Sequence, residues 1–270
     1  MHARQRSGTL INQEIYLEKD TYFHRLDPRT KLFALIGFFV IILYFEDPIW
    51  IAPISLLILL HALASGSLAS LRAMRHLLLV LAVSSLILWN LFANGKTPLF
   101  WIIERESLLF SIGRTLVILS LIVEGIVFLS TTRYEEFTLG LISLGLPYRV
   151  GFAISTAFRM VPMIVASAYA VAQAQRSRGL DLDKGNVIER IKKYLPLLIP
   201  VFLSMIRSTN TFVMALESRG FGARKKRTFL LEVGFRKGDY VCIACLLILL
   251  AAATYLKMAG YGAIAGLQRF

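Results

Sequence analysis

Two arginine side chains are the residues of this chain best suited to specific chemistry, and each stands between a serine and a glycine. The two tripeptides are Ser177-Arg178-Gly179 and Ser218-Arg219-Gly220. Each closes a long amphipathic stretch of sequence, and glycine is the residue that most readily ends a helix. A guanidinium at a helix end presents five donors in a fixed plane, which suits the carbonyl and carboxylate oxygens of a partner protein. We therefore expect both arginines to bind a partner protein.

The repetition of the tripeptide is more informative than either copy. A single Ser-Arg-Gly arises by chance in many chains, and its plain interpretation is a solvated helix end. Two copies with their arginines 41 residues apart, both at the ends of amphipathic segments, favour a shared role. Arginine is also enriched among the residues that dominate protein–protein interfaces. The pattern predicts contact with two equivalent points, such as those on a pair of similar subunits.

Other reactive side chains give weaker signals. Asp181 and Asp183 follow the first tripeptide, but no histidine or third acid lies near them in sequence, so a solvated loop is the favoured interpretation. Cys242 and Cys245 lie in an apolar run, and two thiols supply too few ligands for structural zinc. The sequence contains neither a phosphate-binding loop nor a nucleophile elbow. We therefore expect a chain that is not an enzyme and that binds no metal and no cofactor.

The elements that position these residues are mostly membrane helices, judged from composition. Hydrophobic residues make up 56% of the 270 residues and charged residues only 17%, whereas soluble domains carry about a quarter charged residues. Five segments, counted with their flanks, have the length and apolar character of a spanning helix. Their apolar cores are 32–45, 49–64, 77–92, 108–130 and 240–256. The expected fold class is an all-α integral membrane protein with about five transmembrane helices.

Positive charge is distributed unevenly between the two sides of these spans, and the net charge is +13. Lys and Arg number 6, 2 and 17 in residues 1–31, 65–76 and 131–239, but 0, 2 and 2 in residues 46–50, 94–107 and 257–270. Basic residues concentrate on the cytoplasmic side of membrane proteins. The pattern predicts the N-terminus inside and the C-terminus outside, and it explains the charge without nucleic acid as a partner. The run 224–227 is best interpreted as an anchor for anionic lipid headgroups of the bilayer.

The region between the fourth and fifth spans has a different character. A short helical segment, 134–146, precedes two long segments, 149–178 and 186–219, that mix apolar residues with arginines, amides and prolines. Because polar residues interrupt each apolar window, we interpret the long segments as helices packed on each other at or under the membrane surface. A seven-span arrangement is the alternative. We expect three regions: 1–133 with four spans, 134–237 as a cytoplasmic coupling domain, and 238–270 with the last span and tail.

Ionisable residues inside the fourth span are further candidates, because such residues in membrane helices often have a function. Arg114 and Glu124 are ten residues apart, about 15 Å along a helix axis, so they are not expected to pair. Arg114 is close enough to the outer end of the span to reach it. Glu124 is the stronger candidate for a partner contact. His61, in the second span, is expected to be a helix histidine whose hydrogen bonds are satisfied.

The string His24-Arg25-Leu26-Asp27-Pro28-Arg29-Thr30-Lys31-Leu32 begins the first span, and Asp27-Pro28 is a helix-start signal. Together with Arg159-Met160-Val161-Pro162 and the paired tripeptides, this string resembles the transmembrane T component of energy-coupling factor (ECF) transporters. These transporters are a branch of ABC importers for vitamins and metal ions. The resemblance covers nearly the whole chain. In that family the two motifs usually read Ala-Arg-Gly, and serine is a small-for-small replacement.

The resemblance implies a prokaryotic cell-membrane protein whose helix bundle is joined to a cytoplasmic coupling domain of crossing helices. Arg178 and Arg219 would dock into grooves of two ATPase subunits, which would bind ATP and Mg²⁺. Closure of those subunits would change the helix crossing and reorient a small membrane subunit, the S component, which binds the vitamin or metal ion. Glu124 is the candidate contact for the S component. The candidate hinge residues are Arg159, Pro162, Pro196 and Pro200. The alternative function is a self-sufficient secondary transporter with a basic cytoplasmic domain.

Overall fold

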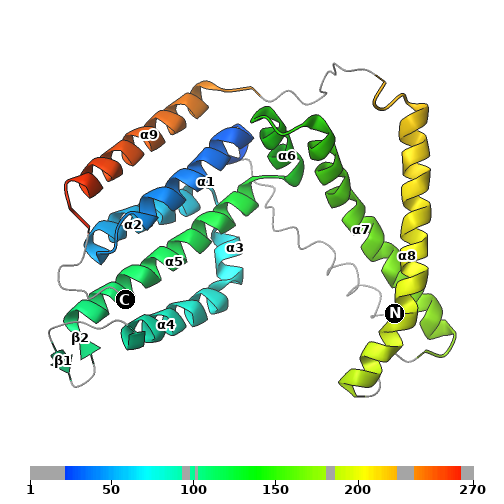
Figure 1. Ribbon diagram of the computed structural model, residues 1–270, viewed down its shortest axis with the longest axis horizontal. Helices are drawn as coiled ribbons and strands as arrows, with labels where there is room; N and C mark the ends of the chain where they lie inside the picture. Colours follow the sequence, from blue (N-terminus) through cyan, green and yellow to red (C-terminus); the bar gives the residue numbers. More distant parts are fainter. Residues whose placement is uncertain (1–21, 93–97, 101–102, 181–185, 224–233, 263–270) are drawn as a thin grey trace. The chain divides into compact units, whose positions relative to one another are not determined.

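The computed structural model describes residues 22–92, 98–100, 103–180, 186–223 and 234–262, which form mainly α-helices (Figure 1). After a short 3₁₀-helix, η1 (Tyr22–Arg25), the helices are α1 (Pro28–Leu43), α2 (Pro48–Ala64), α3 (Leu68–Ala73), α4 (Arg75–Phe92), α5 (Arg105–Thr131), α6 (Tyr134–Ser143), α7 (Tyr148–Ser177), α8 (Val187–Ser218) and α9 (Lys237–Met258). A small antiparallel pair, β1 (Pro98–Phe100) and β2 (Ile103–Glu104), lies between α4 and α5. The predicted all-α class is confirmed.

Two of the helices begin at the same sequence signal, an aspartate followed by a proline. The Asp27 carboxylate accepts a hydrogen bond from the Arg29 N–H at 2.9 Å, and Pro28 opens α1. Asp47 does the same for the Ile49 N–H at 3.0 Å, at the start of α2. Proline suits this position because the N–H that it lacks has no partner within the helix. The helix start predicted at Asp27-Pro28 is confirmed.

The chain divides into two compact units. Unit 1 comprises Met1–Leu146 with Val233–Phe270, and unit 2 comprises Pro147–Glu232. In unit 1, α5 packs against α1, α2 and α4, and α9 packs on α1 (Figure 1). The core of unit 1 is an apolar cluster drawn from α1, α2, α5 and α9 that includes Ile41, Ile42, Ile51, Ile58, Val117 and Ala253. Unit 2 is built from α7 and α8, which pack on each other.

Glycine allows α6 to join unit 1. The expected coupling domain begins at residue 134, whereas the compact unit that contains α7 and α8 begins at Pro147, and α6 packs on α1. A Cβ atom at Gly140 of α6 would lie only 3.1 Å from the Cβ of Pro28. A contact of this length is tighter than most real side-chain contacts, so a side chain at position 140 would press on Pro28, and glycine lets α6 lie close against the start of α1 without that strain.

Five helices in the described part of the chain are long and apolar enough to cross a membrane: α4, α5, α7, α8 and α9. The number agrees with the prediction, but the set differs. The predicted third, fourth and fifth spans are α4, α5 and α9. The first and second are α1 and α2, which have 16 and 17 residues and fall short of that length. By length and composition α7 and α8 qualify as well, as the seven-span alternative requires.

Unit 1 exposes many large apolar side chains. Leu60 of α2, Leu79 and Val80 of α4 and Ile248 of α9 are all more than half exposed. Large apolar side chains exposed in such number are unfavourable in water and are the kind that lipid chains cover. The chain is therefore an integral membrane protein.

Candidate functional site

Both Ser-Arg-Gly tripeptides form the same helix-ending structure. At the end of α7, the Gly179 N–H donates to the Arg176 carbonyl at 3.0 Å and the Leu180 N–H donates to the Gln175 carbonyl at 3.1 Å. These two bonds define the Schellman motif, which needs a left-handed residue at the glycine position. Gly179 has φ +91°, a conformation that costs glycine nothing because it has no Cβ.

The end of α8 repeats this arrangement. The Gly220 N–H donates to the Glu217 carbonyl at 2.9 Å, the Phe221 N–H donates to the Leu216 carbonyl at 3.0 Å, and Gly220 has φ +70°. In both copies the arginine is the cap residue, with nearly identical backbone angles of −86°, 7° and −87°, 6°. The repeated sequence therefore produces two equal structures.

The arginines at both caps are exposed to solvent. Arg178 and Arg219 are both exposed, and neither guanidinium forms an ion pair with a described acidic residue. The serine hydroxyls are directed back into their own helices, where Ser177 donates to the Gln173 carbonyl and Ser218 to the Ala215 carbonyl. The small serine therefore packs against its own helix, and the arginine is the long exposed side chain at each cap.

Three contacts show that α7 and α8 run antiparallel and cross (Figure 1). The hydroxyl groups of Ser167 and Ser204 are 2.9 Å apart. Toward one end of the pair, the Arg159 guanidinium lies 5.2 Å from the ring centre of Phe212. Farther along, the rings of Phe152 and Phe221 are 4.3 Å apart. As the residue number falls on α7, it rises on α8.

The antiparallel crossing places the two arginines at opposite ends of the helix pair. From the Ser167–Ser204 contact, Arg178 lies 11 residues toward one end and Arg219 lies 15 residues toward the other. At 1.5 Å per residue these separations are about 16 and 22 Å along the two helices. A rotation of either helix about the crossing therefore moves the two arginines relative to each other.

The candidate hinge residues lie within α7 and α8, and neither helix is interrupted by its prolines. Pro162 lies inside α7, and Pro196 and Pro200 lie inside α8. Each proline removes one backbone hydrogen bond from its helix, so the helix bends more easily at that point. Arg159 lies one turn before Pro162 and stacks on Phe212 of the opposite helix, so it ties this part of α7 to α8.

Glu124 lies in the interior of unit 1. Its side chain is 2% exposed, and its Oε2 is 3.1 Å from Nδ1 of His61 on α2. The satisfied histidine predicted at position 61 is confirmed. Both residues line a cavity of about 390 Å³ between α1, α2, α5 and α9, whose other walls are mostly apolar. Any partner group that contacts Glu124 must therefore enter this cavity.

The remaining sequence candidates are distributed as follows. Arg114 pairs with Glu46 at 3.8 Å and stacks over Phe110, so it does not pair with Glu124. Cys242 and Cys245 are free thiols, and no group of three His, Cys, Asp or Glu side chains in the described residues is arranged to hold a metal ion. Asp181, Asp183 and the basic run 224–227 lie outside the residues that the structure describes.

Comparison with known proteins identifies the family. The model of the CbiQ family, described as cobalt transport protein, matches residues 19–229. The chain belongs to this family. A curated relative from Lactococcus lactis subsp. cremoris, an energy-coupling factor transporter transmembrane protein EcfT, is 30% identical over 252 residues, which cover 87% of this chain and 93% of the relative. Proteins of the same name from Streptococcus thermophilus and Clostridium kluyveri are each 26% identical, and cover 90% and 87% of this chain and 97% and 92% of their own lengths.

Membership of the CbiQ family makes this chain a T component of the energy-coupling factor type. The resemblance drawn from the Asp-Pro string and the paired tripeptides is confirmed. A T component is one subunit of a transporter complex, and this settles the choice between a transporter subunit and a self-sufficient secondary transporter in favour of the subunit.

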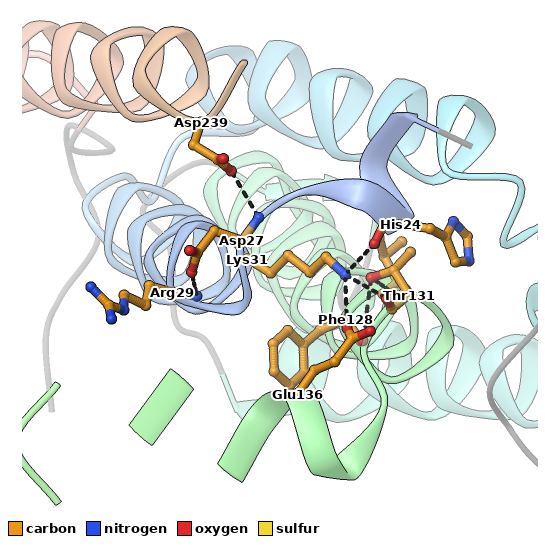
Figure 2. Close-up of polar contacts among 9 residues, drawn as sticks. His24, Asp27, Arg29, Lys31, Phe128, Thr131, Glu136 and Asp239 are labelled. Atoms are coloured by element: carbon orange, nitrogen blue, oxygen red, sulfur yellow. Dashed lines mark hydrogen bonds and ion pairs between the residues drawn. The ribbon is translucent and has the colours of Figure 1, made fainter. Parts of the chain in front are cut away.

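One residue of the Asp-Pro string has a larger structural role than its sequence indicates. A lysine at the end of a membrane span commonly extends to the water interface, but the Lys31 side chain turns inward and is 6% exposed (Figure 2). Its Nζ donates to the carbonyls of Thr131 and His24 at 2.7 and 3.0 Å and lies 3.5 Å from the Glu136 carboxylate. The only sequence signal for this role is the proximity of the lysine to a helix start, which surface lysines share.

Proposed function

We propose that this T component transmits ATP-driven closure of two ATPase subunits to a small substrate-binding membrane subunit, the S component, for the import of a vitamin or a transition-metal ion. ATP and Mg²⁺ bind to the ATPase subunits, and this chain itself carries out no catalysis. The observation that carries the proposal is the pair of equal arginine caps at opposite ends of two crossed helices.

The geometry of the helix pair suits this task. Each guanidinium offers a planar set of donors to a groove on one ATPase subunit. When the two subunits approach each other, they bring the two arginines closer together. The small side chains of Ser167 and Ser204 let the backbones of α7 and α8 approach closely where they meet. A change in the crossing angle would shift the Arg159–Phe212 and Phe152–Phe221 contacts on one side of that point. Pro162, Pro196 and Pro200 provide the points at which the helices bend.

A cavity in unit 1 is the proposed binding site for the S component. The Glu124–His61 pair belongs, with Thr30, Lys31 and Thr131, to the polar lining of a cavity whose other walls are mostly apolar. Polar groups inside a membrane protein are costly and are retained where they serve binding or transport. We propose that a group of the S component enters this cavity and contacts Glu124 there.

The orientation of the chain follows from its charge. We propose that the N-terminus and the coupling helices face the cytoplasm and that the C-terminus faces outward, with the arginines and lysines of residues 131–239 on the inner side. Arg159 and Arg207 lie within α7 and α8. Because a charge at the centre of a bilayer costs about 3 kcal/mol or more, these arginines favour a position of both helices outside the lipid core.

Thiol labelling tests this orientation. A single cysteine at position 184, introduced as Lys184→Cys in a chain whose native cysteines are replaced by serine, should react with a membrane-impermeant maleimide only in inside-out vesicles. Position 184 lies in the connection between α7 and α8, outside the described residues. Reaction in right-side-out vesicles would contradict the proposed orientation. The matched control is Lys257→Cys at the end of α9, which should react only from the outside.

Purification of the complex tests the proposed assembly. When the affinity-tagged chain is isolated from its own host in mild detergent, native mass spectrometry should find it bound to two ATPase subunits and one small hydrophobic protein. The complex should hydrolyse ATP, and this chain alone should not. Isolation of this chain without ATPase subunits, at protein and salt concentrations that preserve other ABC complexes, would contradict the proposed function.

A further inference from the structure

The first turn of α1 contacts both segments through which the chain passes between its two units. The chain leaves unit 1 after α6, entering unit 2 at Pro147, and it returns at Val233 shortly before α9. We refer to the end of α6, residues 136–143, as the exit segment and to residues 235–239 as the return segment. All the contacts described below lie inside unit 1.

Arg29 contacts the two segments with one side chain. Its Nε donates a hydrogen bond to the hydroxyl of Ser143, the last residue of α6. Its guanidinium carbon lies 5.3 Å from the ring centre of Phe235, in the return segment. A cation above an aromatic face is attracted by the negative face of the ring. Because Arg29 is only half-buried, its position depends on these two partners more than on the core.

The neighbours of Arg29 add contacts to the same two segments. On the exit side, Pro28 packs against Gly140, and Lys31 pairs with Glu136 at 3.5 Å. On the return side, the Asp27 N–H donates to Asp239 Oδ1 at 2.8 Å (Figure 2). Asp239 is fully buried, and its other oxygen accepts the Arg236 N–H at 2.7 Å. Buried bonds to a carboxylate are strong and directional, so they hold the start of α9 in one position.

We propose that residues Asp27–Lys31 form a clamp that holds the exit and return segments together and transmits movement of the coupling helices into the membrane helices. This inference rests on the proposed function. A cap and membrane anchor needs only the Asp27 side chain and a basic residue near the interface. The first turn of α1 makes more contacts than that role requires. Pro28, Arg29 and Lys31 contact α6, and Asp27 and Arg29 contact residues 235–239.

The clamp gives both covalent connections a single point of attachment on α1. A displacement of unit 2 pulls on the exit and return segments together, and a rigid helix moves as one body when its first turn is displaced. Since α9 packs along α1 and begins at the return segment, movement at the clamp reaches Cys242, which lies one turn beyond Asp239. Cys242 and Cys245 both line the cavity. The rate at which these thiols react should therefore change when movement of the coupling helices reaches α9.

The test compares thiol labelling with and without nucleotide in the complex with its ATPase subunits, reconstituted in lipid nanodiscs. N-ethylmaleimide is the probe, and intact mass spectrometry of this chain gives the labelling rate of Cys242 and Cys245. We expect a non-hydrolysable ATP analogue with Mg²⁺ to change this rate in the unaltered complex. In the variants Arg29→Ala and Gly140→Val the nucleotide-dependent change should be lost, although both variants bind the ATPase subunits as the unaltered chain does.

The matched control is Arg72→Ala, which removes an exposed arginine from α3 in the connection between α2 and α4. This variant should keep the nucleotide-dependent change. If Arg29→Ala and Gly140→Val also keep it, or if the unaltered complex shows no change, the clamp is disproved while the proposed function stands. If the unaltered chain does not bind the ATPase subunits at all, the proposed function fails instead.

Discussion

Replacement of Arg178 and Arg219 together by alanine should weaken binding of the ATPase subunits by about a thousandfold. Arginines at the centre of an interface often contribute about 2 kcal/mol each, and 4 kcal/mol corresponds to this loss of affinity. Both side chains are exposed at their helix ends, so the variant should fold and insert into the membrane as before. The affinity of purified ATPase subunits for the chain in immobilised nanodiscs measures the effect. Transport by the assembled complex should also be lost.

The control for this experiment removes two other exposed arginines, through Arg72→Ala with Arg207→Ala. It lowers the net charge equally, so it separates specific docking from general electrostatic attraction. We expect a change in affinity of less than about threefold, because exposed charges away from an interface contribute little. Equal affinity of the two double variants for the ATPase subunits would contradict the docking role of Arg178 and Arg219.

Replacement of Gly179 and Gly220 together by valine should weaken ATPase binding roughly tenfold to a hundredfold while both arginines remain. A β-branched residue at a positive φ is strained by about 1–2 kcal/mol. The chain at both caps, with φ of +91° and +70°, would then leave the Schellman geometry and present each guanidinium in another direction. The same binding measurement shows the effect, and circular dichroism should find the helix content unchanged.

The matched control for the glycines is Gly260→Val. Gly260 ends α9 with the same pair of hydrogen bonds, from its own N–H to the Lys257 carbonyl and from the Tyr261 N–H to the Leu256 carbonyl, and it has φ +84°. It therefore carries an equal strain but no docking arginine. ATPase affinity should be unchanged in this variant. A similar loss in both variants would mean that the caps affect general stability instead of aiming the arginines.

Much of the fold could be predicted because its signals are local. The Asp-Pro start of α1 and the helix ends at Gly179 and Gly220 depend on residues that are neighbours in sequence. The apolar runs of α4, α5 and α9 are long enough to identify on their own. The family resemblance followed from the same short motifs. How the two Ser-Arg-Gly motifs are used in the complex stays a prediction.

The features that the sequence did not reveal depend on partners far apart in the chain. The inward position of Lys31 requires carbonyl groups from residues 24 and 131 and a carboxylate from α6. The pairing of Glu124 with His61 joins two helices, and its burial could not be read from α5 alone. The membrane position of α7 and α8 is ambiguous by composition, because both are long and apolar enough to span and both carry arginines.

In the assembled transporter, Arg178 and Arg219 should connect the crossed helices to two separate ATPase subunits. Electron cryomicroscopy of the purified complex measures this connection. We expect the guanidinium of Arg178 to lie within hydrogen-bonding distance of one ATPase subunit and that of Arg219 to lie within the same distance of the other. A complex in which both side chains project into solvent, with the ATPase subunits bound elsewhere, would disprove the docking role of both arginines.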